Sequence, residues 1–250
     1  MSGTRIAVIA DIHGNDLALE AVLADIERRG ISRIVNLGDH LSGALNAART
    51  ADILMARPDI LAIAGNHDRW LLDKPRSDMG DWDRIAHELL SPQHLNWLAQ
   101  LPASRTVQDD IFLCHGTPAS DTTYWLDEAA RDGAMRLSSL ARIESLAEGF
   151  GHPVLLCGHT HIARAVRLPD GRLIVNPGSV GSPAYDDDTP FEHKVETGSP
   201  HARYAILENR DGLWEAAFQL VAYDHMAMAR LAESRDQHAW ASALSTGWLR

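Results

Sequence analysis

The sequence of 250 residues has few cysteines and no long apolar run. Cys114 and Cys157 are its two cysteines, and each lies near the end of a short apolar segment, so we expect two buried, reduced thiols. No segment approaches the ~20 consecutive apolar residues that a membrane span needs. Asp11 interrupts the amino-terminal apolar run before it reaches the length of a signal peptide. These absences predict a protein of a reducing cytoplasm, without a membrane partner.

Positive charge is also scarce. The chain has 23 Lys and Arg against 34 Asp and Glu, which gives a formal net charge of −11. Such a charge disfavours non-specific binding to nucleic acid or to an anionic membrane. It does not exclude an anionic substrate, because bound divalent cations would reverse the sign of the charge locally.

The composition and pattern predict one α/β domain. The length and a hydrophobic fraction of 45% are enough for a substantial core, so we expect a single domain over 1–250. Short apolar strands at 6–10, 34–37 and 60–64 alternate with amphipathic helices at 19–26 and 44–55. This alternation favours right-handed crossovers on a mainly parallel sheet.

Residues 68–105 interrupt that rhythm, and we expect them to form a small helical cap. Trp70, Trp82 and Trp97 lie there among polar helical segments; they form the core of the cap or line a pocket. Later segments are expected as follows: strands at 111–114, 154–157, 163–168 and 173–175, a helix around 136–148, a long loop at 176–200, an antiparallel pair at 204–207 and 214–221, and a helix at 224–233.

Five of the expected strands end in side chains that can bind a metal ion. These strand ends carry Asp11 and His13, Asp39, Asn66-His67-Asp68, His115, and His159 and His161. In open α/β sheets, ligands bind outside the carboxyl ends of the strands, so these ends would converge on one site.

Each of these fragments has an ordinary explanation by itself. Asp39 alone would be taken for a helix cap, and an Asp-x-His after a strand for a cap and a solvated histidine. His159 and His161, however, lie on the same side of an extended segment, as ligands of neighbouring metals would. Five such strand ends in one chain are hard to explain as caps and therefore predict a metal site.

The ordered series resembles the calcineurin-like metallophosphoesterase superfamily. The residues that carry the resemblance are Asp11-x-His13, Gly38-Asp39, Gly65-Asn66-His67-Asp68, His115-Gly116 and Gly158-His159-Thr160-His161. The later Asn176-Pro177-Gly178-Ser179 resembles the small bacterial and archaeal phosphodiesterase branch. The resemblance implies a four-layer α/β/β/α sandwich with two mixed β-sheets.

The resemblance also implies two divalent metal ions and a role for each ligand. Asp11, His13 and His161 would hold the first metal. Asn66, His115 and His159 would hold the second, and Asp39 would bridge the two. Oxygen and imidazole ligands suit Mn, Fe, Zn, Ni or Mg without choosing among them. A hydroxide bridging the metals would hydrolyse a small phosphate ester, and a phosphodiester fits best.

Three neighbouring residues have more open roles. His67 is expected to be the general acid, with Asp68 orienting its imidazole. Arg69 would steady a phosphate or be a surface charge, and His40 would contact the site or be exposed. Farther along, Tyr124 and Trp125 are candidates for a pocket wall, and the run Asp186-Asp187-Asp188 is a solvated loop, a further cation site or a gate.

Two other functions compete with a phosphodiesterase. One is a non-catalytic metal-binding scaffold for protein interactions on the same fold, which the full ligand set disfavours. The other is a phosphomonoesterase, or a nucleotide or protein phosphatase. In relatives of the protein-phosphatase kind an Arg follows Gly-Asp, whereas this chain reads Gly38-Asp39-His40-Leu41-Ser42-Gly43 and lacks it.

Overall fold

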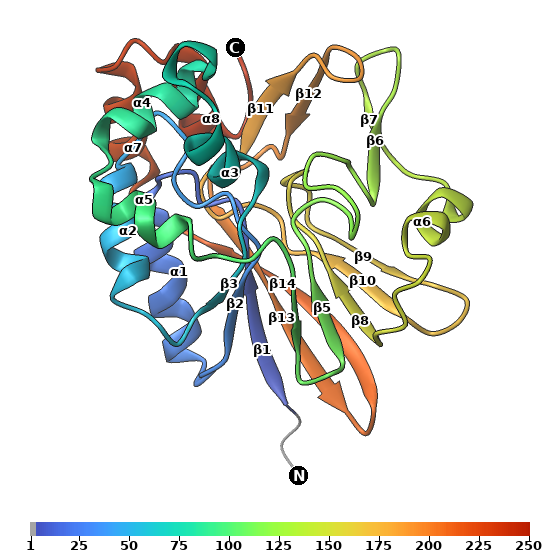
Figure 1. Cartoon of the computed structure of the whole chain (residues 1–250). Helices are drawn as coiled ribbons and strands as arrows, with labels where there is room; N and C mark the ends of the chain where they lie inside the picture. Colours follow the sequence, from blue (N-terminus) through green and yellow to red (C-terminus); the bar gives the residue numbers. More distant parts are fainter. Residues whose placement is uncertain (1–3) are drawn as a thin grey trace.

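The computed structural model describes residues 4–250, and two five-stranded mixed sheets form its centre (Figure 1). The first sheet has the order β14 (Leu213–Val221), β13 (Ala202–Arg210), β1 (Arg5–Ile9), β2 (Ile34–Asn36) and β3 (Leu61–Ala62). The second has the order β4 (Arg105–Val107), β5 (Ile111–Leu113), β8 (Val154–Leu156), β10 (Leu173–Asn176) and β9 (Arg164–Arg167). In each sheet three adjacent strands are parallel: β1, β2 and β3 in one, and β5, β8 and β10 in the other.

Alternating side chains on β1 explain the layers. Ala7 and Ile9 point into the core beneath the helices, whereas Ile6 and Val8 point into a core shared with the second sheet. The far face of the second sheet packs on the helix α6 (Leu140–Leu146) through Ile143. The chain is therefore a four-layer α/β/β/α sandwich, in which α6 alone is the helix of the fourth layer among residues 4–250, as Figure 1 shows.

The other helices gather on the outer face of the first sheet (Figure 1). They are α1 (Asp16–Arg28), α2 (Ala47–Met55), α3 (Asn66–Asp73), α4 (Asp81–Leu89), α5 (Pro92–Leu98), α7 (His225–Glu233) and α8 (His238–Thr246). The segment expected as a cap supplies α3, α4 and α5, with a 3₁₀ turn at Arg76–Asp78. Leu71, Ala86 and Leu98 from this segment pack on Ala47 and Ala51 of α2, so the insertion continues the helical layer.

Three expectations for local structure need correction. The helix expected around 136–148 begins only at Leu140, because 135–137 pair as β7 (Met135–Leu137) with β6 (Asp127–Ala129). The segment 176–200 is not all loop, since β11 (Ala184–Asp187) and β12 (His193–Glu196) form a hairpin within it. The carboxyl-terminal segment contains a helix, α8, that its sequence did not indicate.

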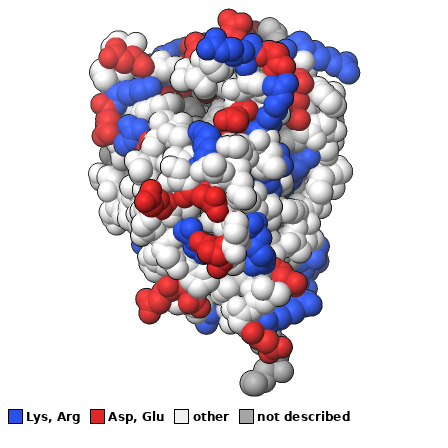
Figure 2. Space-filling model, turned by 90° about the vertical axis from the view of Figure 1, so that its right-hand side faces the viewer, with Lys and Arg blue, Asp and Glu red and all other residues white. Residues whose placement is uncertain are grey.

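Two surface properties bear on the expected partners. No helix within residues 4–250 is both long and apolar enough to cross a bilayer. Figure 2 shows basic and acidic side chains interspersed over the face that it presents. The compartment and the absence of nucleic-acid and membrane partners remain predictions.

Candidate metal centre

The seven expected ligands converge at the carboxyl ends of five parallel strands, drawn from both sheets. Asp11 and His13 follow β1, Asp39 follows β2, and Asn66 follows β3 as the first residue of α3. From the second sheet, His115 follows β5, and His159 and His161 follow β8. The carboxyl-end edges of the two sheets therefore meet at this site.

The backbone at five of these residues is left-handed. The φ angles are 55° at Asp11, 51° at His13, 55° at Asp39, 70° at His159 and 58° at His161. A non-glycine residue in this region costs on the order of 1 kcal/mol or more, and such residues concentrate at functional sites. Here the left-handed backbone conformation lets each side chain point from the end of its strand toward the common centre.

The side-chain atoms form two groups of potential metal ligands. In one, atoms of Asp11, His13 and His161 lie within 4.8 Å of one another, and in the other so do atoms of Asp39, His115 and His159. The Nε2 atom of His161 is 3.5 Å from Oδ1 of Asp11, and Nε2 of His115 is 3.1 Å from Oδ2 of Asp39. The groups adjoin, because Nε2 of His115 is also 3.9 Å from Oδ1 of Asp11.

Backbone carbonyls fix the tautomer of the histidines. Nδ1 of His13 donates to the Ser42 oxygen at 2.8 Å, and Nδ1 of His161 donates to the Ser182 oxygen at 2.9 Å. The two Nε2 atoms then carry lone pairs, and they lie only 3.1 Å apart. Two lone pairs at this distance repel each other, and a cation between them would remove the repulsion.

His115 is held in the same way, and the side chain of Asn66 has no hydrogen-bond partner within the described part of the chain. Nδ1 of His115 donates to the Leu37 oxygen at 2.7 Å. The Asn66 side chain is buried, and neither its oxygen nor its nitrogen has a hydrogen-bond partner among residues 4–250. An unpaired buried amide costs about 1–3 kcal/mol, which coordination of its oxygen to a cation would offset.

Burial sets most of the pKa values at the centre. Burial lowers the pKa of His13 to about 4 and that of His159 to about 3, so both rings are neutral, as metal ligands must be. Burial likewise raises the pKa of Asp11 to about 8, with a further contribution from the nearby Asp39. The buried Asp11 carboxylate thus lacks enough compensating positive charge from the protein, and the donor set fits divalent cations.

Two groups at the centre shift against the effect of burial. Burial would lower the pKa of His115, but the adjacent Asp39 and Asp11 raise it to about 10. Burial would raise the pKa of Asp39, but His115 and His67 hold it well below its ordinary value. Asp39 therefore carries a full negative charge between the two groups of ligands, the position that a bridging carboxylate needs.

The structure corrects the expected partner of His67. Nδ1 of His67 donates to Oδ1 of Asp83 in α4 at 2.7 Å, whereas the Asp68 carboxylate is hydrogen-bonded to other groups. Burial would lower the pKa of His67, but Asp39 and Asp83 raise it above its ordinary value. Ser42 also donates to Asp83, at 2.6 Å. Asp83 lies 16 residues beyond His67 in the helical insertion, and no sequence signal singled it out.

Asp68 instead organises the turns behind the ligands. Its carboxylate accepts the backbone N–H of Asp39 at 2.8 Å, of His40 at 3.0 Å and of Gly65 at 2.9 Å. It also accepts Nδ1 of His40 at 2.7 Å, so His40 is a buried neighbour of the ligand turn and not an exposed histidine. Arg69 forms a bidentate pair with Asp121, at 2.7 and 2.9 Å, which fits the surface role.

Glycine is required where the turns approach most closely. A Cβ atom at Gly65 would lie 2.2 Å from Oδ1 of Asp39, a distance that no side chain can occupy. The segment Asn176–Ser179 supports the ligand loops from the other side. Asn176 donates to the Gly158 oxygen at 2.6 Å, and the Ser179 hydroxyl donates to the Asp11 oxygen at 2.7 Å.

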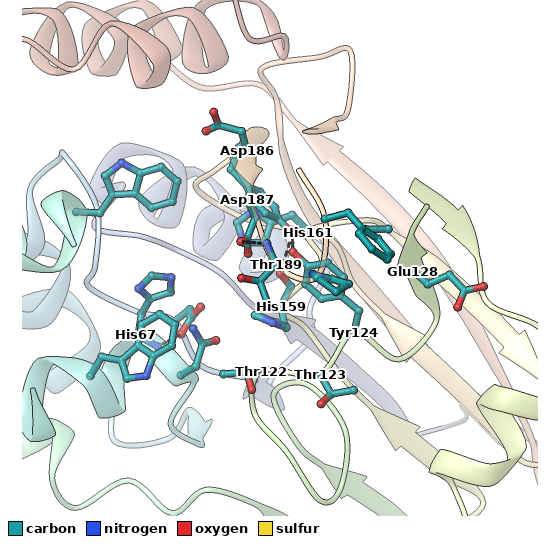
Figure 3. Close-up of a pocket in the computed structure, with 18 of the residues that line it drawn as sticks. His67, Thr122, Thr123, Tyr124, Glu128, His159, His161, Asp186, Asp187 and Thr189 are labelled. Carbon is teal, nitrogen blue, oxygen red and sulfur yellow. Dashed lines mark hydrogen bonds between the residues drawn. The ribbon is translucent and has the colours of Figure 1, made fainter. Parts of the chain in front are cut away.

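A cavity of about 790 Å³ opens over the centre (Figure 3). Figure 3 shows His67 on one side and Tyr124 and Glu128 on the other, with Asp186 and Asp187 beyond His159 and His161. Trp70 and Trp82 also line the cavity, so both tryptophans face the site. Tyr124 is a lining residue, as one expectation had it, whereas Trp125 is buried in the core beside α6. Part of the acidic run thus borders the site.

A family-wide comparison agrees with this geometry. The profile of the calcineurin-like phosphoesterase superfamily domain matches residues 4–198, a span that includes every proposed ligand. The chain belongs to this superfamily. The match confirms the resemblance and the fold that it implies, and it identifies the site as that of a phosphoesterase family with candidate groups for divalent metals.

Two similar proteins match most of this chain. An uncharacterized protein of Methanocaldococcus jannaschii, MJ0912, is 26% identical over 227 residues, which cover 84% of this chain and 85% of that protein. A metallophosphoesterase from Sphaerobacter thermophilus has a TM-score of 0.72 at 24% identity, covering 98% of this chain and all of that one. The second likeness shows that the fold extends beyond residue 198 to the carboxyl-terminal helices.

Proposed function

We propose that this phosphoesterase is a phosphodiesterase that uses two divalent cations and acts on a small phosphate ester. The observation that carries the proposal is the arrangement of His13 and His161, whose Nε2 lone pairs face each other at 3.1 Å beside Asp11. The second group, with Asp39, His115 and His159, supports a second cation. When bound, two such cations acidify a shared water and neutralise charge on the phosphoryl oxygens.

The protein's own residues hold and protonate the substrate. His67 lies across the cavity from His159, where it would reach the leaving oxygen of a bound ester (Figure 3). Asp83 accepts a hydrogen bond from Nδ1–H of His67. The opposite nitrogen, Nε2, then carries the proton that the leaving group needs. Asp39 accepts the His67 backbone N–H at 3.0 Å and so couples the position of the acid to the ligand set.

The test is hydrolysis of bis(p-nitrophenyl) phosphate by the purified full chain, with Mn²⁺ supplied and then removed by a chelator. We expect turnover that requires Mn²⁺ and that falls by more than about 100-fold in Asp39→Asn, because loss of even an outer-sphere partner of a metal ligand costs up to that factor. Asp59→Asn, a change in a half-exposed carboxylate paired with Arg57, is the control and should retain full activity.

Metal analysis of the same samples separates the alternatives. A protein that binds two cations but hydrolyses no phosphate ester would be the scaffold, and the proposal would be wrong. Turnover of p-nitrophenyl phosphate well above that of the diester would contradict the diester preference and favour a phosphomonoesterase.

A further inference from the structure

The wall of the cavity beyond the metal ligands combines aromatic rings with carboxylates. Trp70 and Trp82 lie on the side of His67, and Tyr124, Tyr185 and Phe191 lie on the other side. The Tyr124 ring packs against that of His159 at a tilt of 56°, with the ring centroids 4.9 Å apart, which places the aromatic wall directly beside the candidate centre. A substrate held there by its phosphate would therefore extend between aromatic surfaces.

The charges on this wall are mainly negative. Outside the ligand set and His67, the charged residues that line the cavity are Glu128, Asp186, Asp187 and Arg142. Nη1 of Arg142 already donates to the backbone carbonyl oxygen of Tyr124 at 3.0 Å, and its Nε is 3.7 Å from Oε2 of Glu128. The charges of Arg142 and Glu128 offset each other, and Asp186 and Asp187 remain as excess negative charge.

This distribution restricts which groups the cavity accepts next to the scissile phosphate. Cations at the centre would bind one phosphoryl group, but a second phosphate placed along the wall would face the carboxylates of Asp186 and Asp187. Lys194, which pairs with Asp186 across β11 and β12, does not line this cavity. Aromatic rings flanked by carboxylates instead attract an ammonium group, through the ring quadrupole and through charge. Cations do lie over two of these rings: Nζ of Lys74 is 3.8 Å from the Trp70 centroid, and the Arg131 guanidinium is 4.9 Å from that of Phe191.

We propose that the site selects phosphodiesters in which one esterified group carries a positively charged ammonium, and that it discriminates against polyphosphates. This inference rests on the proposed phosphodiesterase function and names the substrate class of that same site. Asp186 and Asp187 are its specificity-determining residues, and the aromatic wall encloses the ammonium.

A pair of substrates of the same shape tests the role of the charge. p-Nitrophenyl phosphocholine carries a trimethylammonium group, and p-nitrophenyl 3,3-dimethylbutyl phosphate replaces its nitrogen by carbon. The two share a leaving group, so their chemical steps are alike. We expect kcat/KM for the choline ester to exceed that for the neutral ester by about tenfold, with the difference mainly in KM.

Variants of neighbouring residues locate the effect. Asp186→Asn and Asp187→Asn should each reduce the choline preference about threefold, and together they should nearly abolish it, with kcat/KM changing more for the choline ester than for the neutral ester. Asp188→Asn is the matched control, because Asp188 belongs to the same acidic run but does not line this cavity. It should keep the wild-type preference.

The outcomes separate this inference from the proposed function. Metal-dependent hydrolysis of both esters at equal kcat/KM, or a preference that survives the double variant, overturns the ammonium specificity and leaves the phosphodiesterase intact. Faster hydrolysis of a nucleoside triphosphate than of the choline ester overturns it as well. If neither ester is hydrolysed with Mn²⁺ present, the phosphodiesterase proposal itself fails.

Discussion

At the scale of single residues, the centre depends on partners that hold each reactive ring in one orientation. The ligand histidines His13, His115 and His161 each donate Nδ1–H to a backbone carbonyl, whereas His67 donates to a carboxylate. A carbonyl acceptor keeps the proton on Nδ1 and directs Nε2 toward the centre, as a metal ligand requires. A carboxylate stabilises the protonated ring, as a general acid requires.

The carboxylate Asp83 should therefore matter most when the leaving group is poor. For methyl aryl phosphates, we expect Asp83→Asn to lower kcat by about 10–100-fold with phenol as the leaving group, and by less than about threefold with p-nitrophenol. The measurement is the slope of log kcat against the pKa of the leaving phenol, which should steepen in the variant. The same steepening is expected for His67→Ala, and the double variant should add little to it.

A purely structural role for Asp83 would slow all the substrates equally and leave the slope unchanged. Asp121→Asn is the control. Asp121 pairs with Arg69, which lies in α3 as His67 does, but it is not the hydrogen-bond partner of His67. Its slope should equal that of the wild type.

A second carboxylate, Asp25, connects α1 to β13 away from the site. Its carboxylate accepts the Tyr204 hydroxyl at 2.7 Å and Nε of Arg29 at 2.7 Å. Burial would raise the pKa of Asp25, but the hydrogen bonds from Tyr204, Arg29 and Arg28 hold it below the ordinary value. Because the folded-state pKa is the lower one, this interaction stabilises the fold above the unfolded-state pKa of about 3.9 and is lost as the pH falls through the folded-state value.

We expect Asp25→Asn to lower the free energy of unfolding by about 1–2 kcal/mol at pH 7. The difference from the wild type should shrink as the pH falls below about 4, because the wild-type carboxyl then becomes neutral as well. Urea unfolding at several pH values measures both quantities, and a difference that stays constant down to the acid limit would contradict the assignment. Asp59→Asn, in an exposed pair, should change stability by less than about 0.5 kcal/mol.

At the scale of elements, the helices that follow β14 complete the side of the site nearest His13. Trp240 of α8 is buried, and its ring centroid is 5.3 Å from that of Trp82 in α4 and 6.2 Å from that of His13. The helix α7 packs against α8 through Met228 and Ala232. The carboxyl-terminal pair thus supports both a ligand and the helix that supplies Asp83.

Replacing this buried ring should destabilise the fold strongly. We expect Trp240→Ala to lower the free energy of unfolding by about 3–5 kcal/mol, since it removes a large side chain from a packed cluster. Trp248→Ala is a matched control, because that ring is 48% exposed and its loss should cost less than about 1 kcal/mol. Urea denaturation compares them, and equal losses for the two variants would contradict this role of α8.

At the scale of the whole molecule, the centre joins the two sheets. Asp11 and Asp39 end strands of the first sheet, whereas His115, His159 and His161 end strands of the second. A cation held by residues from both sheets would bind the folded state and would have no comparable site in the unfolded chain. Its binding free energy would therefore add to the stability of the fold.

Metal removal should thus lower the melting temperature of the whole domain. At a Mn²⁺ concentration of about 100 times Kd, linkage gives about 2.7 kcal/mol of stabilisation, which corresponds to roughly 5–10 °C for a chain of this size. Differential scanning calorimetry with Mn²⁺ and with a chelator measures the shift. Asp39→Asn should lose most of it, and an unchanged melting temperature in the wild type would show that these residues hold no cation.

Much of this protein could be predicted from its sequence because the relevant interactions are local. The apolar runs and the polar residues directly after them determined the central strands, and the strand ends determined where Asp11, Asp39 and His159 would lie. The resemblance then correctly implied the superfamily and its layered fold. The roles of the individual ligands remain predictions, which the two groups of side chains support.

The tertiary structure alone decided the contacts between distant segments. The pairing of His67 with Asp83 rather than with the adjacent Asp68 depends on how α4 packs, and no local pattern encodes that packing. The hairpin of β11 and β12, and the helix α8, likewise form where long-range burial outweighs a weak local propensity. Sequence by itself therefore determined which residue types gather at the centre, whereas folding determined the partner of His67 and the aromatic and acidic wall of the cavity.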